Sequence, residues 1–209
     1  METLYLPDAF EEDDAARQVD FVQRYPFANL VSVSDGAPFV THLPLLCVTE
    51  DGRPAKLCGH MARANPQWRH FANQSTALAI FSGPQGYVSP AWYGTPGVPT
   101  WNYAVVHIAG IVRLINDPSQ TVALLEQMTS AFESPMSQPW QADYSTPRTT
   151  KLLESIVGFE LDITAVTGKF KLSQNRPAAD RANVIAQLSQ SSRSSDQELA
   201  QFMMARPEK

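Results

Sequence analysis

Three short segments of this chain combine residue types that suit a planar, phosphorylated ligand. The first, residues 59–66 (GHMARANP), carries Arg63 next to Asn65-Pro66, a pair typical of a helix start. Backbone N–H groups at a helix start attract anions, and an arginine can hold a phosphate through two hydrogen bonds. The structural alternative is that Asn65 only caps the helix while Arg63 pairs with a surface carboxylate.

The second segment, residues 98–103 (VPTWNY), brings aromatic and amide side chains into the start of a predicted strand. A flavin ring needs a flat apolar contact together with hydrogen-bond donors and acceptors along one edge, and Trp101, Tyr103 and Asn102 offer both. The alternative is ordinary core packing beside a turn, because aromatic residues in strands usually pack.

The third segment, residues 168–177 (GKFKLSQNRP), is basic and rich in amides. Strand alternation puts Lys169 and Lys171 on one face, so their charges share a surface. A cation near the N1 and O2 edge of a flavin would stabilise its anionic reduced form, and Gln174 or Asn175 could bond the pyrimidine ring. The alternative is a solvated strand end.

Other chemistries lack support in the sequence. The four histidines are isolated from one another, so no metal site is expected, and no serine lies in a nucleophile-elbow pattern. Neither a Walker motif nor a dinucleotide fingerprint is present. The net charge is −5 and no cluster of lysine and arginine stands out, which disfavours direct binding to a DNA duplex.

Short antiparallel strands with helices at the edges must position these segments. Apolar spacing and turn dipeptides predict helices over 13–24, 65–71 and 119–132, and strands over 28–34, 39–48, 56–60, 76–81, 86–90, 101–115 and 158–167. Gly83-Pro84 is expected to break a strand, Gly168 to end one, and the lone Gly110 to mark a bulge or bend. Residues 133–149 are expected to form a loop. This pattern predicts an α+β protein built around an antiparallel β-barrel.

The composition predicts one folded core in 209 residues, of which 44% are hydrophobic. The first residues lack a basic leader and an apolar segment, and no window could span a membrane, so the cytoplasm is the expected location. Cys47 and Cys58 lie in apolar stretches and are interpreted as buried thiols, with a disulfide between paired strands as the alternative. The tail from Pro177 predicts one or two helices, with residues 189–195 the best candidate for disorder.

Ordered blocks along nearly the whole chain match one known family: residues 5–7 (YLP), 25–28 (YPFA), 41–45 (THLPL), 59–66 (GHMARANP), 83–85 (GPQ), 87–90 (YVSP), 99–103 (PTWNY), 158–160 (GFE) and 171–176 (KLSQNR). Through these blocks the chain resembles the PaiB family of FMN-binding negative transcriptional regulators. The chain departs from the family at the loop 94–97, which is shorter than the lysine-containing loop typical of the family. The resemblance therefore does not support a lid or substrate-binding role for this loop.

This resemblance implies a Greek-key-like split β-barrel similar to pyridoxamine phosphate oxidases, working as a homodimer with FMN at the subunit interface. It would cover residues 1–176, including the 117–150 excursion, with 177–209 as a helical tail. Ala62-Arg63 looks like the element that holds the phosphate, with His60 as a neighbour. The predicted contacts to the ring and ribityl chain are Thr100, Trp101, Asn102, Lys169, Gln174 and Asn175.

Three functions remain open at this point. The first is a flavin-responsive repressor that reaches DNA directly or through another protein, with the acidic charge favouring a partner. The second is a flavin-dependent oxidoreductase with a nicotinamide donor, although no nicotinamide site is evident. The third is haem binding, as in some split-barrel relatives, which rests only on the scattered histidines.

Overall fold

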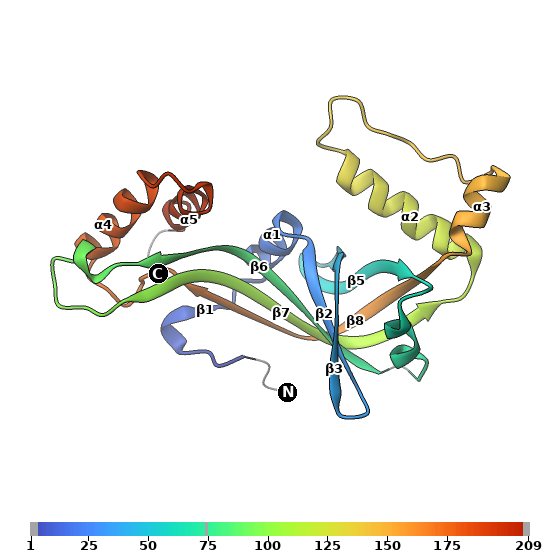
Figure 1. Cartoon of the computed structure of the whole chain (residues 1–209), viewed down its shortest axis with the longest axis horizontal. Helices are drawn as coiled ribbons and strands as arrows, with labels where there is room; N and C mark the ends of the chain where they lie inside the picture. Colours follow the sequence, from blue (N-terminus) through green and yellow to red (C-terminus); the bar gives the residue numbers. More distant parts are fainter. Residues whose placement is uncertain (1–3, 74, 207–209) are drawn as a thin grey trace. The chain divides into compact units, whose positions relative to one another are not determined.

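A computed structural model describes residues 4–73 and 75–206 as a mixed α+β fold (Figure 1). Its antiparallel strands follow the order β3-β2-β6-β7-β8-β5-β4, and β1 pairs with β8. The strands are β1 (Glu11–Glu12), β2 (Phe27–Ser34), β3 (Ala37–Pro44), β4 (Leu46–Glu50), β5 (Arg53–Ala62), β6 (Thr76–Val88), β7 (Thr100–Ile115) and β8 (Ile156–Lys171). The helices are η1 (Asp8–Phe10), α1 (Ala15–Arg24), η2 (Pro66–Phe71), η3 (Pro90–Trp92), α2 (Pro118–Glu133), α3 (Pro147–Leu153), α4 (Ala178–Ser189) and α5 (Ser194–Met204).

The chain forms two compact units. Unit 1 contains residues 15–81 and 107–166, and the described part of unit 2 contains residues 4–14, 82–106 and 167–206. Strands β6, β7 and β8 therefore each contribute residues to both units. The described part of the helical tail predicted over 177–209 belongs to unit 2. The expected absence of a leader rests partly on residues 1–3, which lie outside the described residues.

Two Asp-Gly pairs form tight hairpin turns. In the turn between β2 and β3, Asp35 and Gly36 have φ values of 52° and 78°. In the turn between β4 and β5, Asp51 and Gly52 have φ values of 49° and 74°. Two successive residues with positive φ match the twist of a tight antiparallel hairpin, which is why Asp-Gly is favoured there.

Three predicted strand boundaries are wrong. The strand expected over 39–48 is two strands, because Leu45 is buried and its N–H donates to the Pro26 carbonyl at 2.9 Å. Strand β6 runs unbroken through Gly83-Pro84, since proline can adopt extended backbone where the sheet needs no donor from it. Strand β8 continues past Gly168, which pairs with Glu12 of β1.

The predicted first helix and the helix after β7 are confirmed, and both bury one face in unit 1. Helix α1 buries Phe21 and Val22. Helix α2 starts where Asp117 accepts the Ser119 N–H at 2.8 Å, and its Leu124 and Met128 form a core cluster with Cys58 of β5. This packing ties α2 to the strand that leads into the first predicted binding segment.

Two segments expected to be irregular contain helix. Helix α3 begins inside the predicted 133–149 loop, with Thr146 as its N-cap. The segment 189–195, expected to be disordered, instead contains the end of α4, the start of α5 and the short connection 190–193 between them. In this connection Ser191 donates to the Asp196 carboxylate at 2.6 Å. Burial of Leu188 and Leu199 holds the two helices together. Within residues 4–73 and 75–206, no helix is long and apolar enough to cross a membrane.

The two cysteines are buried thiols, as predicted. Cys47 pairs with Leu57, whereas Cys58 pairs with Leu46, so the two sulfur atoms point to opposite faces of the β4–β5 pair. A disulfide between them is thereby excluded. Burial raises the pKa of both thiols to about 11, which keeps them protonated and unreactive at neutral pH.

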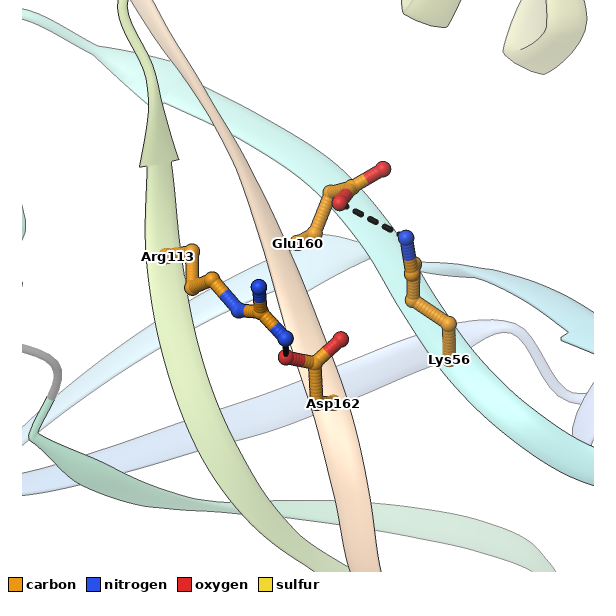
Figure 2. A network of polar contacts seen from close by, with 4 residues as sticks. All are labelled: Lys56, Arg113, Glu160 and Asp162. Atoms are coloured by element: carbon orange, nitrogen blue, oxygen red, sulfur yellow. Dashed lines mark hydrogen bonds and ion pairs between the residues drawn. The ribbon is translucent and has the colours of Figure 1, made fainter.

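A row of charges crosses three neighbouring strands of unit 1 (Figure 2). Lys56 of β5 donates to the Glu160 carboxylate of β8 at 2.7 Å, and Arg113 of β7 pairs with Asp162 of β8. The hydrogen bond that Lys56 donates to Glu160 raises the pKa of Lys56. Because the four side chains are between 29% and 60% exposed, each pair contributes only about 0–1 kcal/mol to stability.

Candidate functional site

Arg63 follows directly after β5 and binds the segment that joins α3 to β8. Its N–H donates to the Ser155 carbonyl at 2.8 Å, and its guanidinium donates from Nε to the Glu154 carbonyl at 2.7 Å and from Nη2 to the Ile156 carbonyl at 2.8 Å. The surface carboxylate of the structural alternative is not its partner. A guanidinium has five N–H groups, so its charge and three donors remain for an anion.

The loop that carries Arg63 is fixed by side-chain hydrogen bonds. Asn65 caps η2 as predicted, because its Oδ1 accepts the Gln67 N–H at 3.0 Å, while its Nδ2 donates to Thr41 Oγ1 at 2.8 Å. The indole N–H of Trp68 donates to the Arg63 carbonyl at 2.9 Å. Arg63 is therefore presented from a rigid loop, which lowers the entropic cost of binding a ligand.

Gln67 anchors η2 to the β2–β3 hairpin and was missed by the sequence analysis. It is fully buried, and its Nε2 donates to the Leu30 carbonyl at 2.9 Å and the Phe39 carbonyl at 3.2 Å. Because η2 is a 3-10 helix of only six residues, its dipole is short. An anion here would therefore depend on the Arg63 side chain rather than on the helix start.

A cavity of about 340 Å³ opens beside Arg63 within unit 1. Its walls include an indole, aliphatic side chains and several amide or hydroxyl groups: Trp68, Ile115, Asn116, Thr121, Leu153, Ile156 and Val157. Apolar walls with a few converging polar groups are typical of small-molecule sites. Trp68, Asn116 and Thr121 were not predicted, because nothing in the local sequence shows that α2 and the end of β7 meet the Arg63 loop.

The other two residues predicted beside Arg63 do not line this cavity. Ala62 is exposed and pairs with Ile156. His60 pairs with Gly158 and is half-buried, and its Nδ1 is buried without a hydrogen-bond partner in the described chain. Burial lowers the pKa of His60, because the charged imidazolium would lose its hydration.

His60 is expected to make the protein less stable as the pH falls. Its pKa in the folded state lies below the value of about 6.5 typical of an unfolded chain, so below that pH the unfolded state binds more protons. The contribution of neutral His60 to the free energy of unfolding is complete above about pH 6.5. It is lost as the pH falls towards the folded-state pKa. Urea unfolding of wild type and His60→Gln between pH 7.5 and 5 checks this: the wild type should lose stability more steeply, and parallel curves would refute it.

In unit 2, the structure brings together Lys169, Lys171, Thr100 and Trp101. The Lys169 side chain is 6% exposed, donates to the Tyr5 carbonyl at 2.7 Å and lies 5.6 Å from the centre of the Tyr103 ring. Lys171 bonds to the Thr100 hydroxyl, and to the Trp101 carbonyl at 2.7 Å. Burial and, to a lesser extent, the charge of Lys169 lower the pKa of Lys171. The result is a pair of lysines, Lys169 buried and Lys171 half-buried, beside aromatic rings.

The remaining residues predicted in unit 2 differ in burial and in hydrogen bonding. Asn102 is buried and bonds to the Ser173 hydroxyl at 2.9 Å, and Gln174 bonds to backbone groups of its own segment, including the Leu172 N–H at 2.6 Å. Their polar groups are thus already used inside the unit. Asn175 is exposed, and Trp101, 46% exposed, lines an apolar groove of about 320 Å³ with Tyr103.

The predicted site residues therefore fall into two groups. His60, Ala62 and Arg63 lie in unit 1, and Thr100, Trp101, Asn102, Lys169, Gln174 and Asn175 lie in unit 2. Within residues 4–73 and 75–206, no group of three His, Cys, Asp or Glu side chains is arranged to hold a metal ion.

Known proteins resemble this chain over 73% to 96% of its length. The Bacillus subtilis (strain 168) protein named "Protease synthase and sporulation protein PAI 2" is 35% identical over 204 residues, which cover 96% of each chain. "Uncharacterized protein AN0679" of Emericella nidulans is 32% identical over 187 residues, which cover 73% of each chain. The match to PAI 2 confirms the predicted relationship to the PaiB family.

Solved structures confirm the predicted α+β split-barrel fold. The FAD and heme binding protein of Mycobacterium smegmatis superimposes with a TM-score of 0.61 at 18% identity, over 77% of this chain and 73% of that protein. The flavocytochrome Anf3 of Azotobacter vinelandii gives 0.59 at 16% identity, over 77% and 69%. A family model described as "Putative FMN-binding domain" matches residues 4–165. This chain is a member of that FMN-binding-domain family.

Proposed function

We propose that this protein binds FMN as a cytoplasmic homodimer and uses the bound flavin to regulate gene expression. The observation that carries the flavin proposal is Arg63: its guanidinium is fixed at the edge of a cavity, and its partners in the described chain are neutral carbonyl oxygens. A fixed cation with unused donors suits a phosphate monoester.

The cavity beside Arg63 also suits the rest of the FMN molecule. Trp68 offers an aromatic face, aliphatic side chains form flat walls, and Asn116 and Thr121 supply hydrogen-bonding groups. Its volume of about 340 Å³ lies at the lower end of the range for small-molecule sites, which fits a cofactor that a second subunit covers in part. When bound, FMN would supply electron-transfer chemistry that no side chain provides.

An exposed apolar sheet face supports the proposed homodimer. Phe27 and Val33 of β2 and Val40 of β3 are 65%, 64% and 46% exposed, and strand pairing puts them on the same face of the hairpin. The opposite face of this hairpin holds the Arg63 loop through Thr41 and Gln67. Exposed apolar side chains that share one sheet face are typical of a protein interface, and a second copy would bury them.

The regulatory part of the proposal rests on the similarity to PAI 2, whose name refers to protease synthase and sporulation. Action through a protein partner is favoured over direct contact with DNA. The net charge is −5, and α5, the second helix of the α4–α5 hairpin, carries Asp196 in its first turn and Glu198 just after it. These carboxylates would repel DNA phosphates. A band shift with purified protein that weakens as salt rises would instead favour direct binding.

The second candidate is a flavin-dependent oxidoreductase with a nicotinamide donor. The observation that favours it is the apolar groove at Trp101 and Tyr103 in unit 2, which offers a surface for a second planar ring. Steady consumption of NADPH after addition of FMN would support this activity. Flavin that binds without turnover would support regulation.

The flavin proposal is tested by equilibrium titration of the purified chain with FMN and riboflavin. We expect saturable binding of one FMN per subunit, with riboflavin bound more weakly because it lacks the phosphate. Static light scattering on the same sample should give twice the chain mass of 23.1 kDa. Failure to bind FMN would overturn the flavin proposal, and a monomer would overturn the homodimer.

A further inference from the structure

A second cavity of unit 1 has a different chemistry. It has a volume of about 380 Å³ and lies between the C-terminal half of α2 and the loop that leads towards α3, which arches away from α2 in Figure 1. Its chemically distinctive lining residues are Glu126, Ser130, Glu133, Trp140 and Tyr144. None of its lining residues belongs to the Arg63 cavity, so it is a separate site.

The α2 wall of this cavity is polar and negative. Glu126, Ser130 and Glu133 recur at helical spacing along one side of α2, while Leu124 and Met128 pack into the core. The lining contains two carboxylates and no lysine, arginine or histidine. A ligand with positive charge would therefore meet no opposing cation in the wall.

The opposite wall is aromatic and is anchored to the helix. The N–H of Trp140 donates to Glu133 Oε2 at 2.8 Å, which holds the loop against α2. The Trp140 side chain is nevertheless 61% exposed, and the Tyr144 side chain also lines the cavity. An exposed indole is costly to leave in water, and its electron-rich face attracts organic cations.

We propose that this cavity binds an alkylammonium ion, with the cation held between the Trp140 and Tyr144 rings and the carboxylates of Glu126 and Glu133. Aromatic faces next to carboxylates are the surroundings that a methylated or alkylated ammonium group prefers. Two carboxylates among neutral hydroxyl and amide groups are a poorer set for a hard metal ion, which takes six or more oxygens, than for an organic cation. The volume accommodates a small organic molecule.

The test uses choline and its neutral isostere 3,3-dimethyl-1-butanol, which share shape but differ in charge, in calorimetric titrations of the full chain at constant ionic strength. We expect saturable binding of choline, with the neutral analogue at least about tenfold weaker. Glu126→Gln and Trp140→Leu should each weaken choline binding about fivefold to tenfold. Glu50→Gln, which removes an exposed carboxylate at the end of β4, should leave it unchanged.

Absence of choline binding, or equal binding of the neutral analogue, would overturn the proposal. If Trp140→Leu does not fold, Glu126→Gln still tests the proposed site, because Glu126 is exposed on α2 and its replacement leaves the core intact. If Glu126→Gln binds choline as tightly as wild type, the Glu126 carboxylate does not contact the ligand and the proposed site is wrong. FMN affinity serves as a second readout, since the two cavities share no residue and neither variant should alter it.

Discussion

Replacing Arg63 with alanine is expected to weaken FMN binding by about 2 kcal/mol, or about 30-fold in Kd. The loss follows from the charge-assisted hydrogen bonds that a phosphate would form with the unused guanidinium N–H groups. Riboflavin lacks the phosphate, so its affinity should hardly change. Fluorescence titration of both flavins with wild type and Arg63→Ala measures the difference.

Two control variants separate phosphate binding from a structural role. Arg63 also binds the carbonyls of Glu154 and Ile156, so the thermal midpoint without ligand must be measured for each variant. Arg63→Lys keeps the charge and should retain part of the FMN preference. Arg53→Ala removes an exposed cation at the start of β5 and should have no effect. Equal loss of FMN and riboflavin in Arg63→Ala would show that Arg63 only shapes the cavity.

Gly110→Ala is expected to destabilise the protein by about 3 kcal/mol. A Cβ atom at residue 110 would overlap both the Asp162 carbonyl oxygen and the Leu161 side chain of β8. The carbonyl belongs to a strand fixed on both sides, because β8 lies between β7 and β5 in the sheet. The clash can therefore be relieved only by separating β7 from β8.

Urea unfolding followed by circular dichroism measures this loss, with Ala109→Ser as the matched control. Ala109 is the preceding residue of β7 and is half-buried, so its added hydroxyl should change stability by less than about 0.5 kcal/mol. If Gly110→Ala is as stable as the wild type, β8 does not approach β7 this closely in solution.

Much of the fold was predictable because its signals are local. The Asp-Gly turns, the Asp117 and Asn65 caps and the amphipathic helices α1 and α2 each follow from a few neighbouring residues. The wrong predictions concern strand boundaries that depend on residues far away in the sequence. Gly83-Pro84 does not interrupt β6, and Gly168 continues β8 because β1 supplies a partner for it.

The candidate site was predictable only in part, for the same reason. Arg63 and its loop carry local motifs, so the sequence pointed to them. Trp68, Asn116 and Thr121 join the cavity only through the packing of η2, β7 and α2, which no short motif encodes. Asn102 and Gln174 look suited to a ligand in the sequence, yet the structure uses their polar groups within unit 2. Their contact with a flavin stays a prediction, as does that of Asn175.

The most direct test of the proposed site is a crystal structure of the protein grown with FMN. We predict that the phosphate accepts hydrogen bonds from the Arg63 guanidinium, that the rest of the cofactor occupies the cavity beside Trp68, and that a second subunit covers it. A structure with the flavin phosphate bound elsewhere, and the Arg63 cavity filled only by water, would contradict the proposal.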